Sequence, residues 1–346
     1  MAVITPQWFA DLETNMSVIV QQEYPRLLEH QWWTTFGRTR TSSAGREVIA
    51  WLLSTAMIHD QGDGGNIRFD DLVSQTTEMR SKFAGGALEL SRSQLEDTDG
   101  LGTDLAAAWS SQMAVQMAYW PQRGAAHFLK NGHDPAQYSA YDGKPFFAKD
   151  HPINPYREAA GTYANLFTGA ADGAYPGALP IHADGAGKVD DQTALINLQK
   201  AFSFIASIRM PNGVDPRGLR PAGLLVPPAM LGRATMITQA KFLSVAGGGS
   251  SDFEALIRAL GYSIPIQVDE LGGFENDTTY YIVAEQITDY QLGAMVYLER
   301  SPFQIQWYGP QTQAQLNRTD RWEWHCKGRN SIQPGHPFLL FKCQGA

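Results

Sequence analysis

The chain has 346 residues, of which 43% are hydrophobic, and this is enough to bury the core of one large domain or two moderate ones. Its 27 Lys and Arg residues against 35 Asp and Glu residues give a formal net charge of −8, which argues against an extended basic surface for tight nucleic-acid binding. The two cysteines, Cys326 and Cys343, are too few for a disulfide framework and predict free thiols in a reducing compartment.

The N-terminal part of the sequence predicts a helix and then an irregular aromatic segment. Residues 1–10 carry no Lys or Arg and no long apolar run, so no secretory signal peptide is expected. Thr5 and Pro6, followed by apolar residues at helical spacing, predict a helix that ends near Tyr24. Residues 32–41 are aromatic and of mixed charge without a clear period, and they are expected to lie against a partner subunit or the chain's own core.

Glycines punctuate the next segment, residues 58–89, and separate short alternating runs near residues 67–73 and 78–83. This pattern predicts a long hairpin-like excursion. The glycines that bracket it are Gly62, Gly64, Gly65, Gly85 and Gly86.

The strongest helical pattern in the chain follows. Thr103 or Asp104 can cap a helix whose predicted apolar face carries Leu105, Trp109, Met113, Met117 and Trp120. Pro121 is expected to kink or restart this helix, which then continues to residues 131–132. Residues 105–122 carry no charge, but Ser, Gln and Pro residues interrupt the apolar run, so a membrane span is not expected.

The second half of the sequence alternates helices with strands. Residues 151–190 are rich in Gly, Ala, Pro and Asp, which predicts mostly loop. Helices are expected over residues 191–208, 229–239 and 251–260, and strands over residues 223–226, 264–268 and 279–284. This alternation favours a compact mixed subdomain over roughly residues 191–300. Further strands are expected over residues 304–308, 321–327 and 337–342.

None of the motifs that carry chemistry is complete. The acidic run over residues 96–100 resembles the start of a calcium loop, but Ala108 stands where the twelfth position, counted from Asp97, needs Glu. His325, Cys326, His336 and Cys343 lack the close paired spacing of a zinc site. Asp-Gly pairs at residues 142, 172 and 184 predict turns.

Motifs for nucleophilic catalysis and for nucleotide binding are also absent or incomplete in the sequence. The sequence has no Gly-x-Ser-x-Gly elbow, no dinucleotide fingerprint and no lysine after the glycine-rich run at residues 247–249. No catalytic, cofactor-binding or metal-binding residue is therefore predicted.

Several segments, in order along the chain, resemble the major head subunit family of phage Mu and its prophage relatives. They are Ile49-Ala50-Trp51-Leu52 after Ser42-Ser43, residues 90–97, Tyr141-Asp142-Gly143-Lys144-Pro145-Phe146-Phe147 with Asp150-His151-Pro152, Ala164-Asn165-Leu166, Leu224-Leu225-Val226-Pro227-Pro228, and Leu298-Glu299-Arg300-Ser301-Pro302. The segment from residue 141 to residue 152 is the most specific.

The resemblance implies an α+β chain with the Johnson fold of tailed-phage capsid proteins. It assigns residues 1–55 to an N-terminal arm, 56–90 to an extended loop, 91–190 with 301–346 to a peripheral domain, and 191–300 to an axial domain. The predicted long helix, about residues 104–131, would be the spine helix of the peripheral domain. No sequence motif identifies a Lys–Asn crosslink between subunits.

The implied function is a major capsid protein that self-assembles through hexamers and pentamers into an icosahedral head around double-stranded DNA. Expected partners are itself, separate scaffold and portal proteins, a decoration protein in some heads, and DNA contacted weakly and without sequence preference; no membrane is expected. Assembly would take place in the bacterial cytoplasm and the product would be the virion head.

Candidates for contacts between subunits come from the aromatic-rich ends of the chain and from the cations of the expected loop. They are Trp8, Phe9, Trp32, Trp33, Arg68, Arg80, Lys82, Trp322 and Trp324. For the tryptophans and the phenylalanine, a place in the core is the alternative. For the chain as a whole, an enzyme of unknown type and another phage structural or adaptor protein are the alternatives.

Overall fold

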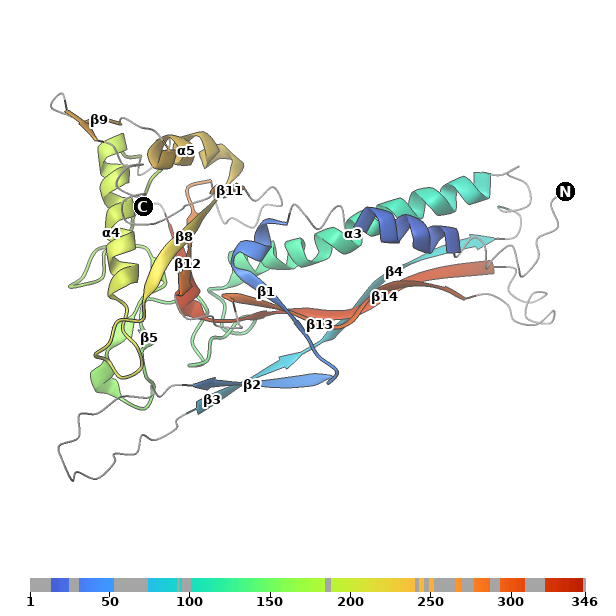
Figure 1. Cartoon of the computed structure of the whole chain (residues 1–346), viewed down its shortest axis with the longest axis horizontal. Helices are drawn as coiled ribbons and strands as arrows, with labels where there is room; N and C mark the ends of the chain where they lie inside the picture. The colour runs from blue at the N-terminus through green and yellow to red at the C-terminus, as the bar shows by residue number, and fades with distance from the viewer. Residues whose placement is uncertain are drawn as a thin grey trace, which may run out of the picture.

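The computed structural model describes residues 14–24, 31–52, 74–91, 94, 101–183, 188–239, 243–245, 249–251, 266–268, 277–286, 293–308 and 321–344. Figure 1 shows an elongated molecule in which a long helix runs along a narrow sheet, while a second sheet lies with shorter helices at the other end. Three two-stranded ribbons complete the described strands.

The long helix, α3 (Leu101–Asn131), confirms the strongest helical prediction and continues through Pro121. Ser110 is accommodated because its hydroxyl donates to the carbonyl of Ala106 at 2.8 Å. The buried face is rotated from the predicted one: Leu105 is 51% exposed, whereas the small side chains of Ala106 and Ala114 are fully buried. Small residues let the helix lie close to the sheet, which the apolar-spacing argument did not foresee.

The sheet beside α3 has four strands in the order β1 (Gly37–Thr41), β13 (Met295–Tyr308), β14 (Arg321–Pro334) and β4 (Lys82–Ser91). β1 runs parallel to β13, and the other neighbours are antiparallel. The helix of residues 14–24 buries Met16 and Val20 among side chains of α3 and the sheet. The predicted N-terminal helix is thus confirmed over these residues, and it belongs to the subunit's own core.

The second sheet has five strands in the order β11 (Ile266–Val268), β8 (Leu219–Val226), β12 (Tyr280–Gln286), β15 (Leu340–Cys343) and β7 (Leu166–Phe167). The helix α4 (Asp191–Ser207) begins as predicted, because Asp190 caps it by accepting from the backbone N–H of Thr193 at 2.9 Å. The 3₁₀ turn η3 (Pro228–Met230) and the helix α5 (Leu231–Gln239) occupy the predicted 229–239 helix.

The remaining described elements are short. β2 (Arg46–Leu52) pairs antiparallel with β3 (Ser74–Arg80), β5 (His151–Pro152) with β6 (Thr162–Tyr163), and β9 (Leu243–Val245) with β10 (Gly249–Ser251). The 3₁₀ turns η1 (Trp32–Thr35), η2 (Glu158–Ala160) and η4 (Pro337–Leu339) complete the set. Residues 151–183 are mostly loop, as their composition predicts.

Two glycines join the two sheets. A Cβ on Gly335 would lie 2.0 Å from the carbonyl oxygen of Gly293, so only glycine permits this close approach of two backbones. The N–H of Gly335 donates to Ala294 and that of His336 donates to Gly293, at 2.8 and 3.0 Å. The chain therefore passes between the sheets at one hydrogen-bonded junction.

Three sequence expectations change. The predicted excursion over residues 56–90 is displaced, because the ribbon begins at Arg46 and residues 82–90 are a strand of the four-stranded sheet. The strand β15 at the C-terminal end lies in the five-stranded sheet and not beside α3. Since β13 begins at Met295, the four-stranded sheet already starts within residues 191–300. The predicted helix over 251–260 lies almost entirely outside the described residues.

The described helices include none that is long and apolar enough to cross a membrane.

Candidate functional site

The most specific sequence segment, residues 141–152, folds around a buried ion pair. The Nδ1 atom of His151 lies 2.8 Å from a carboxylate oxygen of Asp142, and the two side chains are 0% and 2% exposed. His151 also reaches the carbonyl of Phe146 at 3.1 Å and stacks on Tyr163 with ring centroids 5.3 Å apart. The predicted turn at Asp142-Gly143 is present, with Gly143 at φ 76°, but the ion pair was not predicted.

The ionisation of Asp142 follows from opposing influences. Burial, the largest influence, acts to raise its pKa, but the hydrogen bond and charge of His151 and the backbone N–H of Lys144 outweigh burial. The pKa of Asp142 therefore lies below its ordinary value, and the carboxylate is charged at neutral pH. With both side chains sealed from solvent, this pair is suited to holding the loop in shape, since no substrate can reach it.

A second buried polar group, the side chain of Asn165, connects this loop to the C-terminal end of the chain by hydrogen bonds. The amide of Asn165 donates to the carbonyls of Phe146 and Pro337 at 2.7 and 3.1 Å, and its oxygen accepts from the N–H of Ala148 at 2.9 Å. One side chain thus connects three separate segments, which accounts for an asparagine at a fully buried position.

His325, Cys326, His336 and Cys343 do not form a metal site. Cys326 lies in β14 and Cys343 in β15, in different sheets. Burial raises the pKa of Cys326 to about 11 and that of Cys343 further, so both thiols stay protonated at neutral pH. Burial and the nearby charge of Arg217 lower the pKa of His336 to about 3. Among the described residues, no group of His, Cys, Asp and Glu has the arrangement of a metal site.

The tryptophans proposed as contacts between subunits are core residues. Trp32 and Trp33 are 5% and 4% exposed, and Trp322 and Trp324 are 3% and 0% exposed. Such side chains offer little surface to a partner, which favours the alternative of a place in the chain's own core; their role between subunits stays a prediction. Trp8, Phe9 and Arg68 lie outside the described residues.

Two predicted cations, Arg80 and Lys82, are exposed, and the structure separates their roles. Arg80 ends the β2–β3 ribbon and forms an ion pair with Glu78, which also binds Arg46 at 2.5 Å. Lys82 begins β4 and is paired in register with Asn330 of β14. The ribbon also carries an ion pair between Arg40 of β1 and Glu47 of β2.

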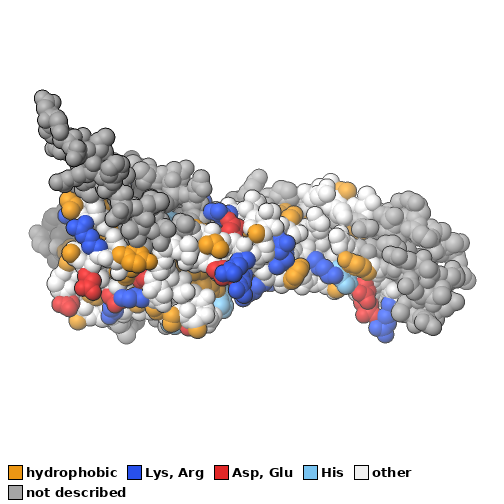
Figure 2. Space-filling model, turned by 90° about the horizontal axis from the view of Figure 1, so that it is seen from below, with side chains coloured by type: hydrophobic (Ala, Val, Ile, Leu, Met, Phe, Trp, Pro, Cys, Tyr) orange, Lys and Arg blue, Asp and Glu red, His pale blue; other side chains and the backbone are white. Residues whose placement is uncertain are grey.

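The face of the four-stranded sheet that points away from α3 carries the most distinctive exposed surface. It is called the basic sheet face here and consists of Phe83, Gly85, Ala87, Glu89, Arg300, Tyr308, Arg321, Glu323, His325, Lys327 and Arg329. Lys and Arg side chains gather along the underside of the molecule in Figure 2. The face also carries exposed apolar side chains, of which Phe83 is 81% exposed and Tyr308 is 46% exposed.

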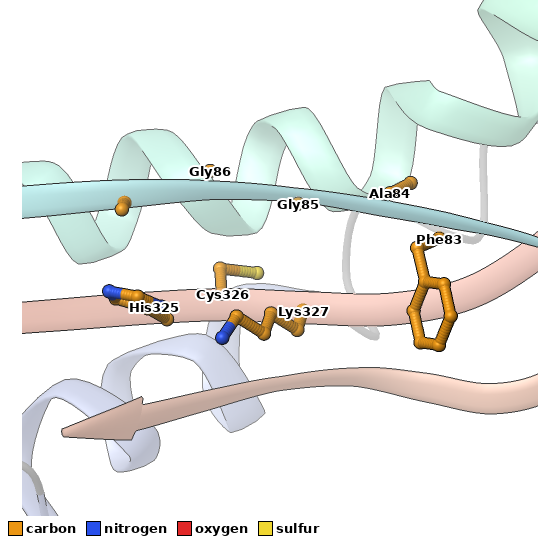
Figure 3. Close-up of a pocket in the computed structure, with 8 residues that line it drawn as sticks. Phe83, Ala84, Gly85, Gly86, His325, Cys326 and Lys327 are labelled. Atoms are coloured by element: carbon orange, nitrogen blue, oxygen red, sulfur yellow. The ribbon is translucent and has the colours of Figure 1, made fainter. Parts of the chain in front are cut away.

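A hollow of about 520 Å³ lies on this face between β4 and β14. Figure 3 shows Phe83 and Lys327 on one side of the sheet, whereas Cys326 points toward the helix. The floor lies at Gly85 and Ala87, where a missing and a small side chain leave the space unfilled. The result is an open apolar depression bordered by charge.

Cations border the hollow in contact with aromatic rings. The guanidinium of Arg329 lies 4.8 Å from the ring centroid of Phe83, and the ammonium of Lys327 lies 4.7 Å from that of Tyr308. Arg321 pairs with Glu89 at 2.5 Å, and His325 lies 2.6 Å from Glu323. In the described part of the chain, no carboxylate pairs with Lys327 or Arg329.

Arg300 approaches Arg329 beside the turn between β1 and β2. A Cβ added to Gly45 would lie 2.8 Å from Nη1 of Arg300 and 3.2 Å from Nη2 of Arg329, so the two guanidinium groups are neighbours. The Nε atom of Arg329 is also buried without a hydrogen-bond acceptor among the described residues. Since no carboxylate of the described residues pairs with either group, the two like charges make a site that favours an anion.

Sequence reasoning missed this surface. Phe83 stands in the outward phase of β4, because Leu88 and Leu90 share the inward phase with Ala84 and Gly86. A large aromatic in the polar phase of a strand was the available signal. The pairing of Arg300 with Arg329 depends on a contact between strands that only the folded chain reveals.

Comparisons with known proteins point to one class. Residues 12–176 match the family of the Mu-like prophage major head subunit gpT. No curated protein matches the chain by sequence.

Several solved structures of similar fold are phage capsids. The capsid of cyanophage P-SCSP1u aligns with a TM-score of 0.52 at 10% identity, over 90% of this chain and 86% of that chain. The mature capsid of bacteriophage PhiM1 aligns with a TM-score of 0.50 at 10% identity, over 91% and 86%. The bacteriophage JBD30 capsid aligns with a TM-score of 0.46 at 11% identity, over 100% and 74%. At these identities, the first two alignments establish the fold alone.

Proposed function

We propose that the chain is a major capsid protein of tailed bacteriophages, which self-assembles through hexamers and pentamers into an icosahedral head around double-stranded DNA. Residues 12–176 match the Mu-like prophage major head subunit family. The family match carries this proposal, and the capsid fold supports it over most of the chain. A shell needs adhesive surfaces around the whole subunit, and the described surface offers a projecting ribbon and an open apolar hollow in place of an enclosed cleft.

The two sheets correspond to two structural roles in this proposal. The four-stranded sheet with α3 is the peripheral domain, and the five-stranded sheet with α4 and α5 is the axial domain. Neighbouring axial domains would surround the centre of a hexamer or pentamer. Peripheral domains would form the contacts along its rim.

The ribbon of β2 and β3 is the described part of the extended loop. Within it, each strand pairs only with the other, and a small cluster of Ile49 and Met79 with Val296 and Leu298 fixes it to β13. Val48 is 54% exposed on the same ribbon. An isolated two-stranded ribbon is marginal in water, so a neighbouring subunit would supply the second buried face.

Other head proteins and DNA are further partners in this proposal. Separate scaffold and portal proteins would start assembly in the bacterial cytoplasm, and a decoration protein would bind the finished head in some phages. DNA would be enclosed without sequence-specific contacts, in keeping with the net charge of −8. An enzyme, or another phage structural or adaptor protein, is the alternative.

Negative-stain microscopy and light scattering of the purified protein test the proposal. Closed shells, hexamers or pentamers at micromolar concentration are the expected result, with or without the cognate scaffold. A protein that stays monomeric, even with its cognate head proteins, would contradict it.

A further inference from the structure

The hollow of the basic sheet face has an apolar floor and a cationic rim. The floor favours one chemical group in a ligand and the rim favours another. Phe83 and the small side chain of Ala87 favour an apolar group. Lys327 and Arg329 favour an anion, since no carboxylate in the described part of the chain pairs with them. A ligand that satisfies both carries an apolar side chain flanked by carboxylates.

Nucleic acid fits this surface less well than protein. A phosphodiester backbone would satisfy the cations, but it would leave the apolar floor and Phe83 exposed to water. Phe83 already lies against the guanidinium of Arg329, which fixes both groups at the same edge of the hollow. The combination of a fixed aromatic group with an arginine is typical of the centre of a protein interface.

The chain itself has the complementary composition. It holds 35 acidic against 27 basic residues, whereas the basic sheet face holds Arg300, Arg321, Lys327 and Arg329 against Glu89 and Glu323. The rest of the chain is therefore more acidic than the whole. In an assembly of identical subunits, a face with excess positive charge is therefore complementary to the more acidic remainder of another copy of the same chain.

We propose that this hollow binds a second copy of the chain, which inserts an apolar side chain beside Phe83 and places carboxylates on Arg300 and Arg329. The inference rests on the proposed function and specifies one contact within it. The incoming carboxylates separate the two neighbouring guanidinium charges at Gly45 and provide an acceptor for the buried Nε of Arg329.

Charge reversal at the rim and removal of the aromatic group test the contact separately. The variants are the double substitution Arg300→Glu with Arg329→Glu, and Phe83→Ser. Lys200→Glu and Tyr156→Ser serve as matched controls, because Lys200 is an exposed lysine of α4 and Tyr156 is 65% exposed at the other end of the molecule. Circular dichroism first establishes that each variant keeps the fold and the melting temperature of the parent.

Assembly is then followed by light scattering. We expect assembly to be at least about tenfold slower for the double variant and for Phe83→Ser, the effect of losing a charge-assisted contact or an interface anchor, and unchanged for the controls. Assembly of the parent should also weaken as salt is raised, and that of the double variant much less.

A crosslinking experiment identifies the partner. Equal amounts of ¹⁴N-labelled and ¹⁵N-labelled parent protein are mixed, assembled and treated with a carbodiimide, which joins amines to carboxylates in direct contact. Crosslinks from Lys327 to Asp or Glu peptides of the other isotope are expected.

The possible outcomes distinguish failure of the proposed function from failure of this one contact. If the parent forms no assemblies, the proposed function fails and this contact fails with it. If the parent assembles and the double variant assembles as Lys200→Glu does, only the contact is wrong. Normal assembly together with lost binding to a short DNA duplex would show that the cations hold phosphate, which also overturns the inference.

Discussion

Trp324 illustrates how single side chains hold the four-stranded sheet against its helices. It is completely buried in β14, in a cluster with Met16, Leu90 and Trp322. We expect Trp324→Ala to lower the free energy of unfolding by about 3–5 kcal/mol, because the surrounding elements cannot close the cavity. Trp109→Ala should cost less, since Trp109 is only partly buried against the same cluster. Thermal denaturation of both variants checks the order, and equal melting temperatures for Trp324→Ala and the parent would refute it.

The Asp142–His151 pair makes stability depend on pH in a defined direction. Since folding lowers the pKa of Asp142 below its ordinary value of 3.8, the ionised carboxylate stabilises the folded state above about pH 4. That contribution is lost as the pH falls through the lowered pKa. Asp142→Asn should therefore melt well below the parent at pH 6, and the difference should shrink toward pH 3.

Differential scanning fluorimetry at several pH values measures this effect. Asp150→Asn is the control, because Asp150 contacts Lys144 at the surface with its side chain 66% exposed. Its melting temperature should stay close to that of the parent. A constant difference between Asp142→Asn and the parent from pH 6 to pH 3 would mean that the carboxylate's charge is not what stabilises the loop.

At the scale of single elements, two adjacent glycines of β4 have different roles. A Cβ on Gly85 would lie 2.3 Å from the carbonyl oxygen of Cys326, which belongs to the backbone of β14 and cannot move alone. A Cβ on Gly86 would lie 3.0 Å from the terminal methyl of Met113, which can rotate away. We expect Gly85→Ala to destabilise the protein by about 1–3 kcal/mol and Gly86→Ala by clearly less. Urea denaturation of the two variants decides the matter.

Protease sensitivity of the ribbon tests its role in contacts between subunits. Arg46, Arg68 and Arg80 belong to the ribbon and its connection, and trypsin should cut after them in the free subunit but not in the assembled head. Lys342, which is fully buried, should resist in both states. Peptide mapping by mass spectrometry identifies the cuts. Equal resistance of the ribbon sites in both states would place the ribbon in the subunit's own core.

The sequence predicted where helices and strands lie better than it predicted which elements and side chains they contact. The apolar spacing of α3 and the cap of α4 are local signals, so the sequence alone located both helices, although α3 begins at Leu101, before its predicted cap at Thr103 or Asp104. The place of β15 in the five-stranded sheet depends on pairing between distant segments, which no local pattern records. The tryptophans were assigned to interfaces for a related reason: an aromatic side chain is equally suited to a core or a contact, and only packing distinguishes the two.

Over the whole molecule, the charge balance predicts weak interaction with DNA. With a net charge of −8, the free subunit should bind a duplex with a dissociation constant above about 1 μM at physiological salt, and more weakly as salt rises. Fluorescence anisotropy with a labelled duplex measures this. Sub-micromolar binding at physiological salt would contradict it and would direct attention to Arg300 and Arg329 as phosphate ligands.

The local charge and the shape of the basic sheet face could not be predicted from the sequence. The excess of acidic residues is visible at once, but the local reversal of charge appears only when β4, β13 and β14 lie side by side. The hollow arises in the same way, from small residues of one strand beside long side chains of the next.

The pairing of α3 with the four-stranded sheet also has mechanical consequences. The 31 residues of α3 and the 14 residues of β13 or β14 each span about 46 Å, so helix and strands form two layers of equal length. Bending with the helix on the concave side compresses the helix and stretches the strands. The strands resist stretching because their backbone is already near full extension. Bending the opposite way compresses the strands, so this resistance is absent. The slab is therefore stiffer in one direction, and a shell of such slabs resists outward and inward loads unequally.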